Sequence, residues 1–174
     1  MLKTIQTHHL ETVIKNHTQD MGGKVVAITG TTSGTGYVCA REIAKLGATV
    51  LLLNRESERS STSIKQLKEA VPKGAFHQVN CDLQDFESVR SAIEEIKGSF
   101  DMLDVLCNNA GVMALPDKAT KDGYDVQMQT NCISHFLLTK ELFPLLKKSA
   151  EARIVNHTSM ARLGADLEEK YFGK

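Results

Sequence analysis

Glycines are spaced through Thr29–Gly36 in a way that predicts a binding site for a pyrophosphate. The apolar run Val25–Ile28 precedes this segment and a helical pattern begins at Tyr37, so a strand leads through a glycine-rich turn into a helix. Glycine lets the backbone turn tightly and approach a ligand without a Cβ in the way. The first amides of the new helix present the positive end of its dipole to the anion. The expected contact residues are Gly30, Thr32, Ser33, Gly34, Thr35 and Gly36.

The residue after the last glycine separates two kinds of nucleotide site. A P-loop carries a phosphate-binding lysine there, whereas this chain has Tyr37, which disfavours hydrolysis of nucleoside triphosphates. A dinucleotide site instead needs a residue that recognises the ribose at the end of the second strand, about twenty residues downstream. The sequence therefore favours a dinucleotide.

The second predicted strand ends at Asn54 and Arg55. An acidic residue there would accept hydrogen bonds from the adenosine 2′-hydroxyl. Asn54 and Arg55 instead leave room for a 2′-phosphate and offer it a planar, permanently charged guanidinium. We therefore expect NADP(H) to be preferred, with NAD(H) possible. In the alternative interpretation Arg55 is an ordinary solvated charge, and Glu56 beside it cancels its field.

Apolar runs of strand length alternate with segments of helical period, which predicts βαβ units and a parallel sheet. The expected strands are Lys24–Thr29, Thr49–Leu53, Ala75–Asn80, Met102–Cys107 and Arg153–His157. The expected helices are Gly36–Leu46, Ser60–Ala70, Phe86–Lys97 and Val126–Lys147. Asp85 is the expected N-cap of the third helix, and Gly98 is expected to follow its end.

Composition limits the class of protein further. The 174 residues fit one domain, and 21 basic side chains balance 21 acidic ones, so no overall charge favours nucleic acid or an anionic membrane. The first twenty residues lack the apolar stretch of a signal peptide or a membrane span, so we expect a soluble, cytoplasmic protein. We expect a polar arm over residues 1–22 and a dinucleotide-binding domain over residues 23–174.

The four cysteines show no metal-binding spacing. Each lies in or beside an apolar run, which favours reduced thiols in the core over zinc ligands or disulfides. They are Cys39, Cys81, Cys107 and Cys132. No metal site is expected.

Taken in order, the motifs resemble those of the short-chain dehydrogenases/reductases. Thr29–Gly36 matches the family's TGxxxGxG turn, with Thr35 where a bulkier apolar residue is usual, and Asn108–Gly111 matches its NNAG segment. Thr120–Thr139 is similar to the branch that contains retinol dehydrogenases and WW-domain oxidoreductases, although Ser134 replaces the usual glycine.

The resemblance implies roles for particular residues. Asp82 and Leu83 would contact the adenine, and Asn131 would position a water in a proton relay. Ser159 would hydrogen-bond the substrate oxygen. The residues implied to line the cofactor pocket after the fourth strand are Asn109, Ala110 and Gly111.

Structural alternatives exist for several of these side chains. Asp82 could form a turn, Asn109 and Asn131 could satisfy backbone groups, and Ser159 could be a loop hydroxyl. His135 and His157 lie in predicted regular elements, so we expect both to be structural.

The family's general acid is a tyrosine in a Tyr-x-x-x-Lys motif. Tyr171 stands twelve residues after Ser159, but Lys174 follows it at the third position and Gly173 interrupts a helix. Positions i and i+3 are rotated slightly apart on a helix, unlike i and i+4. We keep Tyr171 as a candidate and expect the true pair, with the last strands of the family fold, to lie in sequence that this chain lacks. Arg153–His157 would then be an exposed sheet edge.

We therefore expect an α/β, Rossmann-like, doubly wound domain with strand order 3-2-1-4-5. By resemblance, the function would be NADP(H)-dependent interconversion of an alcohol and a carbonyl compound, with a small alcohol, aldehyde or ketone as substrate. A homo-oligomer is possible. The alternatives are a non-catalytic NADP(H)-binding protein, or an inactive fragment without the catalytic pair, and a scaffold that binds nothing.

Overall fold

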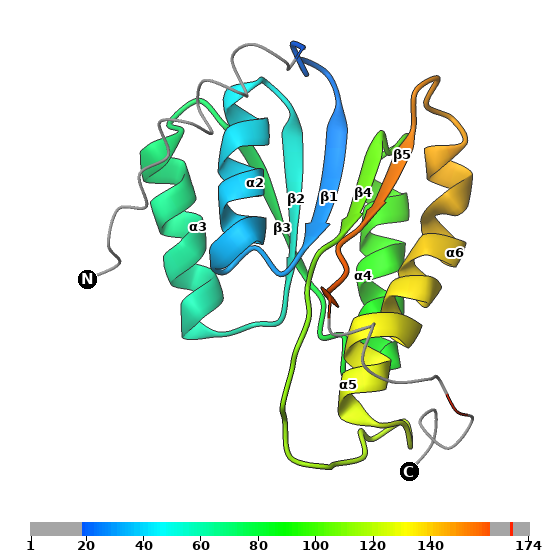
Figure 1. Ribbon diagram of the computed structural model, residues 1–174. Coiled ribbons are helices and arrows are strands. Elements are labelled where there is room, and N and C mark those ends of the chain that lie inside the picture. The colour runs from blue at the N-terminus through cyan, green and yellow to red at the C-terminus, as the bar shows by residue number, and fades with distance from the viewer. Residues whose placement is uncertain (1–18, 161–167, 169–174) are drawn as a thin grey trace.

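A five-stranded parallel sheet forms the centre of the described part of the chain. The computed structural model describes residues 19–160 and residue 168 (Figure 1). Tyr171 and residues 1–18 of the predicted arm lie outside this part. The strands are β1 Val25–Thr29, β2 Thr49–Asn54, β3 Ala75–Asn80, β4 Val105–Asn108 and β5 Arg153–Asn156. Their order is β3-β2-β1-β4-β5, which confirms the predicted Rossmann-like topology.

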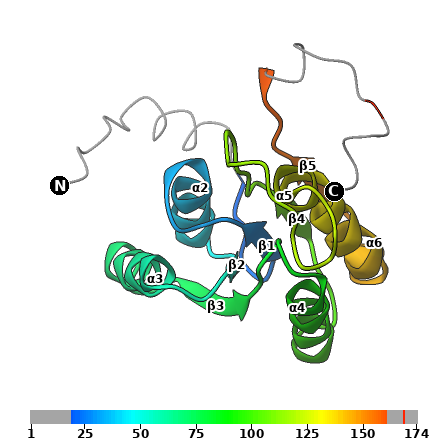
Figure 2. The same cartoon turned by 90° about the horizontal axis from the view of Figure 1, so that it is seen from below.

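Helices cover both faces of this sheet (Figure 2). They are α2 Gly34–Lys45, α3 Glu58–Ala70, α4 Phe86–Ser99, α5 Val126–Met128, the π-helix η1 Gln129–Ile133 and α6 Ser134–Leu146. α2 and α3 pack on one face, and α4 and α6 pack on the other. Because the strands pair in parallel, all of them end at the same edge of the sheet.

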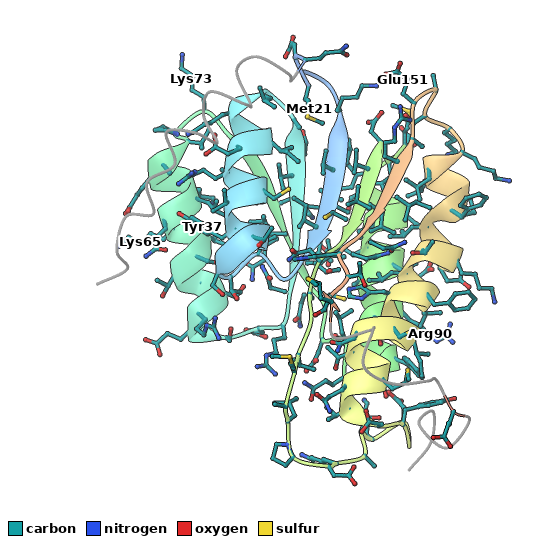
Figure 3. All side chains as sticks on the ribbon, in the orientation of Figure 1. Met21, Tyr37, Lys65, Lys73, Arg90 and Glu151 are labelled. Atoms are coloured by element: carbon teal, nitrogen blue, oxygen red, sulfur yellow. The ribbon has the colours of Figure 1, made fainter. Side chains whose placement is uncertain are left out.

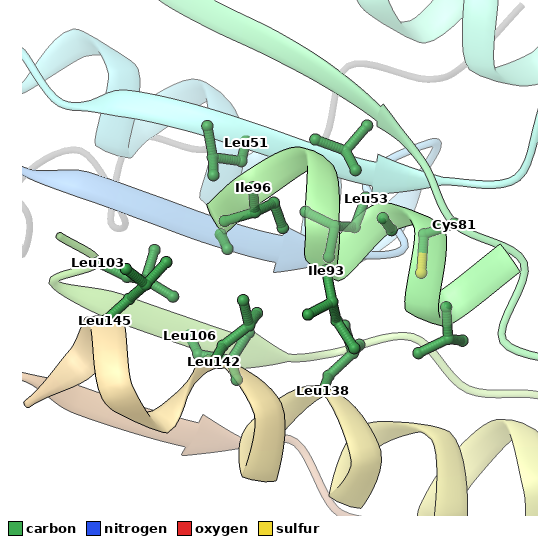
Figure 4. Close-up of a cluster of buried hydrophobic side chains, with 14 of the residues drawn as sticks. Leu51, Leu53, Cys81, Ile93, Ile96, Leu103, Leu106, Leu138, Leu142 and Leu145 are labelled. Carbon is green, nitrogen blue, oxygen red and sulfur yellow. The ribbon is translucent and has the colours of Figure 1, made fainter. Parts of the chain in front are cut away.

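The central strands are buried on both faces. Val26 and Ile28 belong to the core beneath α2 and α3, whereas Ala27 lies in the core beneath α4 and α6. Leu51 and Leu53 of the neighbouring strand join that second core (Figure 4). A strand with helices on both sides needs an unbroken apolar run, and this is why the apolar runs located β1 and β2 from the sequence.

β4 begins at Val105, later than the predicted strand Met102–Cys107. The reason is Asp104, whose carboxylate accepts hydrogen bonds from the Val25 N–H (2.9 Å) and from Lys24 Nζ (3.1 Å). Burial by itself would raise the pKa of Asp104, but these hydrogen bonds hold it below its usual value. The segment before β4 is therefore a side-chain anchor, which an apolar pattern does not reveal.

The predicted single helix Val126–Lys147 consists of α5, η1 and α6. The π-helix widens the turn around Asn131, and the Thr130 hydroxyl donates to the Val126 carbonyl (2.6 Å). Single turns of π-helix are frequent at functional sites. One such turn changes the spacing of apolar residues too little to be recognised in the sequence. The sequence therefore predicted the helical segment but not its interruption.

The helix ends follow their capping residues. Asp85 accepts hydrogen bonds from two N–H groups of the first turn of α4, which confirms the predicted N-cap. α4 continues through Gly98 to Ser99, so the predicted end at Lys97 was wrong by two residues. Ser57 accepts from the Ser60 N–H and starts α3 at Glu58, before the predicted Ser60.

β5 forms one edge of the described sheet and is exposed along its whole length. Ile154 and Val155 keep 38% and 48% of their surface accessible. The predicted exposed edge at Arg153–His157 is confirmed for the described residues. A strand left open in this way presents unpaired backbone groups to other chains.

The cysteines divide by burial. Cys81 is buried, and Cys39 and Cys107 are half-buried, but Cys132 on the π-helix is exposed, so its predicted place in the core was wrong. The amphipathic surface of a helix turns some residues beside apolar runs toward solvent. Among the described residues, no helix has the length and apolar character needed to cross a membrane.

Candidate functional site

A cleft of about 430 Å³ lies at the edge where the strands end. Strands that are adjacent in the sheet but distant in sequence bring their following loops together there. Of the predicted cofactor residues, it is lined by Gly30, Thr32, Ser33, Thr35, Gly36, Asn54, Arg55, Asp82, Leu83, Asn109, Ala110 and Gly111. Gly34 is the predicted cofactor residue that does not line it.

Close backbone approach explains two glycines of the turn after β1. Gly30 has a φ of +72°, and a Cβ there would lie 2.9 Å from the Cα of Ala110. A Cβ on Gly36 would overlap the carbonyl oxygen of Gly30 and the side-chain amide of Asn109. Gly34 has a φ of +59°, but a Cβ at this position would meet no atom within 4 Å, so its requirement is conformational rather than steric.

The N-terminus of α2 opens toward the cleft. Ser33 is its N-cap residue, yet the Ser33 side chain makes no capping hydrogen bond. Its hydroxyl instead accepts a hydrogen bond from Arg59 Nη2 at 3.0 Å. The first amides of this helix are therefore not satisfied by the cap side chain, which is the arrangement that an anionic ligand requires.

Asn54 holds the glycine-rich turn from the end of β2. It is only 3% exposed; its Oδ1 accepts from the Thr31 N–H (2.8 Å) and its Nδ2 donates to Thr31 Oγ1 (2.7 Å). These bonds fix the turn against the neighbouring strand. Arg55, the next residue, is exposed and lines the cleft. The two neighbours therefore differ: Asn54 fixes the turn, whereas Arg55 places a positive charge at the cleft.

Thr29 and Asn109 join the turn to the segment after β4. The Thr29 hydroxyl accepts from the Asn109 and Ala110 N–H groups, both at 2.9 Å. Asn109 Nδ2 donates to the carbonyls of Thr29 (2.9 Å) and Gly30 (3.2 Å). The structural and functional interpretations of Asn109 therefore coincide, because its side chain satisfies backbone groups and lines the cleft at once.

His135 links this network to the π-helix. Its Nε2 lies 2.9 Å from the Thr29 hydroxyl, and its Nδ1 lies 3.2 Å from the backbone carbonyl of Asn131. Only 6% of the residue is exposed. Burial lowers the pKa of His135, with the bond to Asn131 opposing it, so the ring is neutral at neutral pH. The expectation of a structural histidine agrees with this environment.

The loop after β3 forms the far wall of the cleft. Asp82 Oδ1 accepts from the Gln84 N–H (3.0 Å), which closes a small turn beside the cleft. Asp82 thus forms the turn of the structural alternative and also lines the site. Burial, together with the charge of Asp82, raises the pKa of the Cys81 thiol to about 12. Cys81 is therefore an uncharged part of the wall.

The predicted catalytic residues are placed differently from the cofactor residues. Asn131 is not among the lining residues; its side chain accepts from the Val112 N–H and donates to the Val112 carbonyl, both at 2.8 Å. Ser159 is exposed beyond β5 and is not among the residues that line the cleft. Tyr171 lies outside the described residues. The structure therefore brings together the cofactor half of the predicted site.

Sequence reasoning missed part of the cleft. Its further lining residues are Leu53, Ser57, Arg59, Cys81, Gln84, Val112, Thr130 and His157. His157 is exposed, and its Nδ1 lies 3.1 Å from Asn109 Oδ1, so it belongs to the cleft wall rather than to the core. Arg59 lies four residues after Arg55, in the first turn of α3, and the basic side chain so close to the end of β2 is the signal that could have identified it from the sequence.

The residues present fit a nicotinamide dinucleotide. Glycines stand where a Cβ would block the turn, a helix N-terminus faces the cleft, and cationic, amide and hydroxyl groups line it. A dinucleotide needs these groups for its pyrophosphate and its riboses. Within residues 19–160 and at residue 168, the His, Cys, Asp and Glu side chains form no group of three that could hold a metal ion.

Comparison with known families agrees with this geometry. A family profile described as short chain dehydrogenase matches residues 24–167, which is most of the chain. The chain belongs to the short-chain dehydrogenase family. This match confirms the family that the motifs resemble.

Curated members of the short-chain dehydrogenase family resemble the chain over most of its length. An uncharacterised oxidoreductase of Schizosaccharomyces pombe is 41% identical over 163 residues, which are 90% of this chain and 48% of that protein. Retinol dehydrogenase 13 of Homo sapiens is 34% identical over 146 residues, 84% of this chain and 44% of that protein. These relatives place the chain in the retinol dehydrogenase-like branch. It spans about half the length of the curated relatives it matches.

Solved structures of short-chain dehydrogenases share the fold. L-sorbose reductase of Gluconobacter frateurii, complexed with NADPH and L-sorbose, gives a TM-score of 0.71 at 28% identity, over 84% of this chain and 57% of that one. RhlG of Pseudomonas aeruginosa, in an active-site complex with NADP, gives 0.70 at 28% identity, over 87% and 60%.

Proposed function

We propose that this protein is an NADP(H)-dependent oxidoreductase that interconverts an alcohol and a carbonyl compound. The observation that carries the proposal is the cleft at the strand ends, where the glycine-rich turn and the N-terminus of α2 lie beside Arg55. Family membership supports the reaction class. The NADPH and NADP complexes of structural relatives support the cofactor. The substrate proposed is a small or lipophilic alcohol, aldehyde or ketone.

Different residues of this chain would have different roles in the reaction. The cofactor, when bound, supplies or accepts hydride at its nicotinamide ring. Ser159 would donate a hydrogen bond to the substrate oxygen, where negative charge develops during carbonyl reduction. Asn131 would hold a relay water near its backbone carbonyl, at the π-turn that His135 braces. Tyr171 remains the candidate proton donor.

The cofactor preference can be tested at Arg55. Substitution Arg55→Glu places a carboxylate where the 2′-phosphate would lie, so NADPH binding should weaken at least about tenfold through lost attraction and new repulsion. NADH lacks that phosphate and should lose much less affinity. Fluorescence titration measures both affinities. Equal losses for the two coenzymes would show that Arg55 does not recognise the 2′-phosphate.

A second candidate function is binding of NADP(H) without turnover. It is favoured by one observation: Arg41 and Met128 stand four positions after Tyr37 and Tyr124, and Lys174 follows Tyr171 at the third position. Titration with NADPH, followed by turnover assays with a panel of aldehydes, separates the two functions. Tight binding without turnover favours the second candidate. A protein that binds nothing would show no thermal shift at saturating NADPH. The cytoplasmic location and the homo-oligomer stay predictions.

A further inference from the structure

A second arginine lies beside Arg55 on the same wall of the cleft. Arg59 stands in the first turn of α3, lines the cleft, and donates from Nη2 to the Ser33 hydroxyl at 3.0 Å. This bond connects α3 to the N-cap of α2 across 26 residues of sequence. The guanidinium is thereby held beside the cleft, although the residue is exposed.

The position of Arg59 is electrostatically unusual. A helix N-terminus carries partial positive charge, so a cation in the first turn is disfavoured unless an anion balances it. Glu58 shares the first turn of α3, but the ion pairs between described residues include none of Glu58, Arg59 and Arg55. Both guanidiniums therefore face the cleft with charge that no described carboxylate neutralises by an ion pair.

The order of the strands indicates which part of a dinucleotide meets these charges. The pyrophosphate would lie at the N-terminus of α2, after β1, and the adenine would lie beside Asp82, after β3. β2 lies between those strands, so the adenosine ribose falls at the end of β2. Arg55 directly follows β2, and Arg59 stands in the first turn of α3, four residues further along. Their charges therefore flank the ribose rather than the nicotinamide.

We propose that Arg59 is a second specificity-determining residue, which binds the adenosine 2′-phosphate together with Arg55 while the Ser33 hydroxyl fixes its guanidinium. Two arginines offer more N–H donors than one, and a phosphate accepts several of them at once. The neutral hydroxyl of Ser33 holds the guanidinium without cancelling its charge. This inference rests on the proposed binding of NADP(H).

The test compares NADPH and NADH binding to the full chain and to variant Arg59→Gln. The dissociation constant for NADPH should rise about tenfold, which is typical of losing a charge-assisted contact, while that for NADH should change less than about twofold. Lys65→Gln is the matched control, because it removes one positive charge from an exposed position of the same helix (Figure 3). It should leave both constants unchanged.

A double-mutant cycle tests the part assigned to Ser33. Ser33→Ala should weaken NADPH binding less than Arg59→Gln, and it should add little when Arg59 is already replaced. Fully additive losses would overturn the positioning role. Equal loss of NADPH and NADH in Arg59→Gln, or no loss of either, would overturn the specificity role. Thermal unfolding of each variant shows that the fold is kept.

The wild-type chain distinguishes failure of this inference from failure of the proposed function. If the wild-type chain prefers NADPH and Arg55→Glu removes the preference, an unaffected Arg59→Gln variant contradicts the inference about Arg59 alone. If the wild-type chain binds neither coenzyme, the proposed function and this inference are both wrong.

Discussion

The proposed site has a coenzyme end, formed by the predicted cofactor residues in the cleft, and a reaction end, formed by Asn131 and Ser159 outside the cleft lining, and the two ends differ in how they are held. At the coenzyme end, side chains from separate strands fix the glycine-rich turn, as Asn54 does for Thr31 and Asn109 does for Gly30. At the reaction end, Asn131 bonds to the backbone of one residue, and Ser159 is exposed. We therefore expect coenzyme binding and turnover to be separable, because the residues of the coenzyme end lie together in the cleft, whereas Asn131 and Ser159 do not line it.

His135 is the physical connection between the two ends. It contacts the Thr29 hydroxyl at the coenzyme end and the Asn131 carbonyl at the reaction end. Loss of either partner would leave a buried polar atom of the ring without a hydrogen bond, which lowers the free energy of unfolding. Changes at this residue should therefore affect both ends, unlike changes at Ser159.

The largest expected effect is at Gly36. A methyl group in Gly36→Ala would overlap the Gly30 carbonyl and the Asn109 amide, so we expect loss of about 1–3 kcal/mol of unfolding free energy and of detectable NADPH binding. Gly98→Ala in α4 is the control, because open space surrounds that Cβ position and Gly98 is not among the glycines with positive φ. Urea unfolding and NADPH titration measure both. Normal binding by Gly36→Ala would show that the turn is not held as tightly as its contacts indicate.

The next effect is a dependence of stability on pH through His135. The folded-state pKa of this ring lies below its ordinary value of 6.5. As pH falls through 6.5, the unfolded chain binds a proton at this ring that the folded chain does not bind. The free energy of unfolding therefore decreases by up to about 1.4 kcal/mol per pH unit. Stability is fully present above that value and declines until the folded-state pKa is reached.

The variant His135→Gln removes this titration while keeping an amide that can bond to both partners. Urea unfolding between pH 7 and pH 5.5 should therefore give a flatter dependence for the variant than for the wild-type chain. The remaining histidines are common to both proteins, so they cancel in the comparison. Identical slopes would show that burial of His135 does not penalise its charge.

The smallest expected effect is at Ser159. Its substitution, Ser159→Ala, should change the dissociation constant for NADPH less than about twofold, because an exposed hydroxyl outside the cleft wall contributes little to coenzyme affinity. Any turnover detected with aldehydes should fall sharply in the same variant. A large loss of NADPH affinity would contradict the separation of the two ends.

The sequence located the strand, turn and helix of the coenzyme end because their signals are local. A strand, a glycine-rich turn and a helix follow one another within Val25–Lys45, and each is specified by its own residues. The same holds for the N-cap at Asp85. Twelve of the thirteen predicted cofactor residues line the cleft. The other, Gly34, does not line it and instead allows the backbone a positive φ in the turn.

Only the tertiary structure decided which polar side chains became partners. Nothing in the local sequence shows that Asn54 is buried against Thr31, that Arg59 reaches Ser33, or that a π-turn interrupts the long helix. The same limit applies to Cys132, whose apolar neighbours did not show that it is exposed. The apolar period determines which elements form and how they stack, because burial of apolar surface has no preferred direction. Hydrogen bonds depend on distance and angle, so their partners are settled only when distant segments are brought together in the fold.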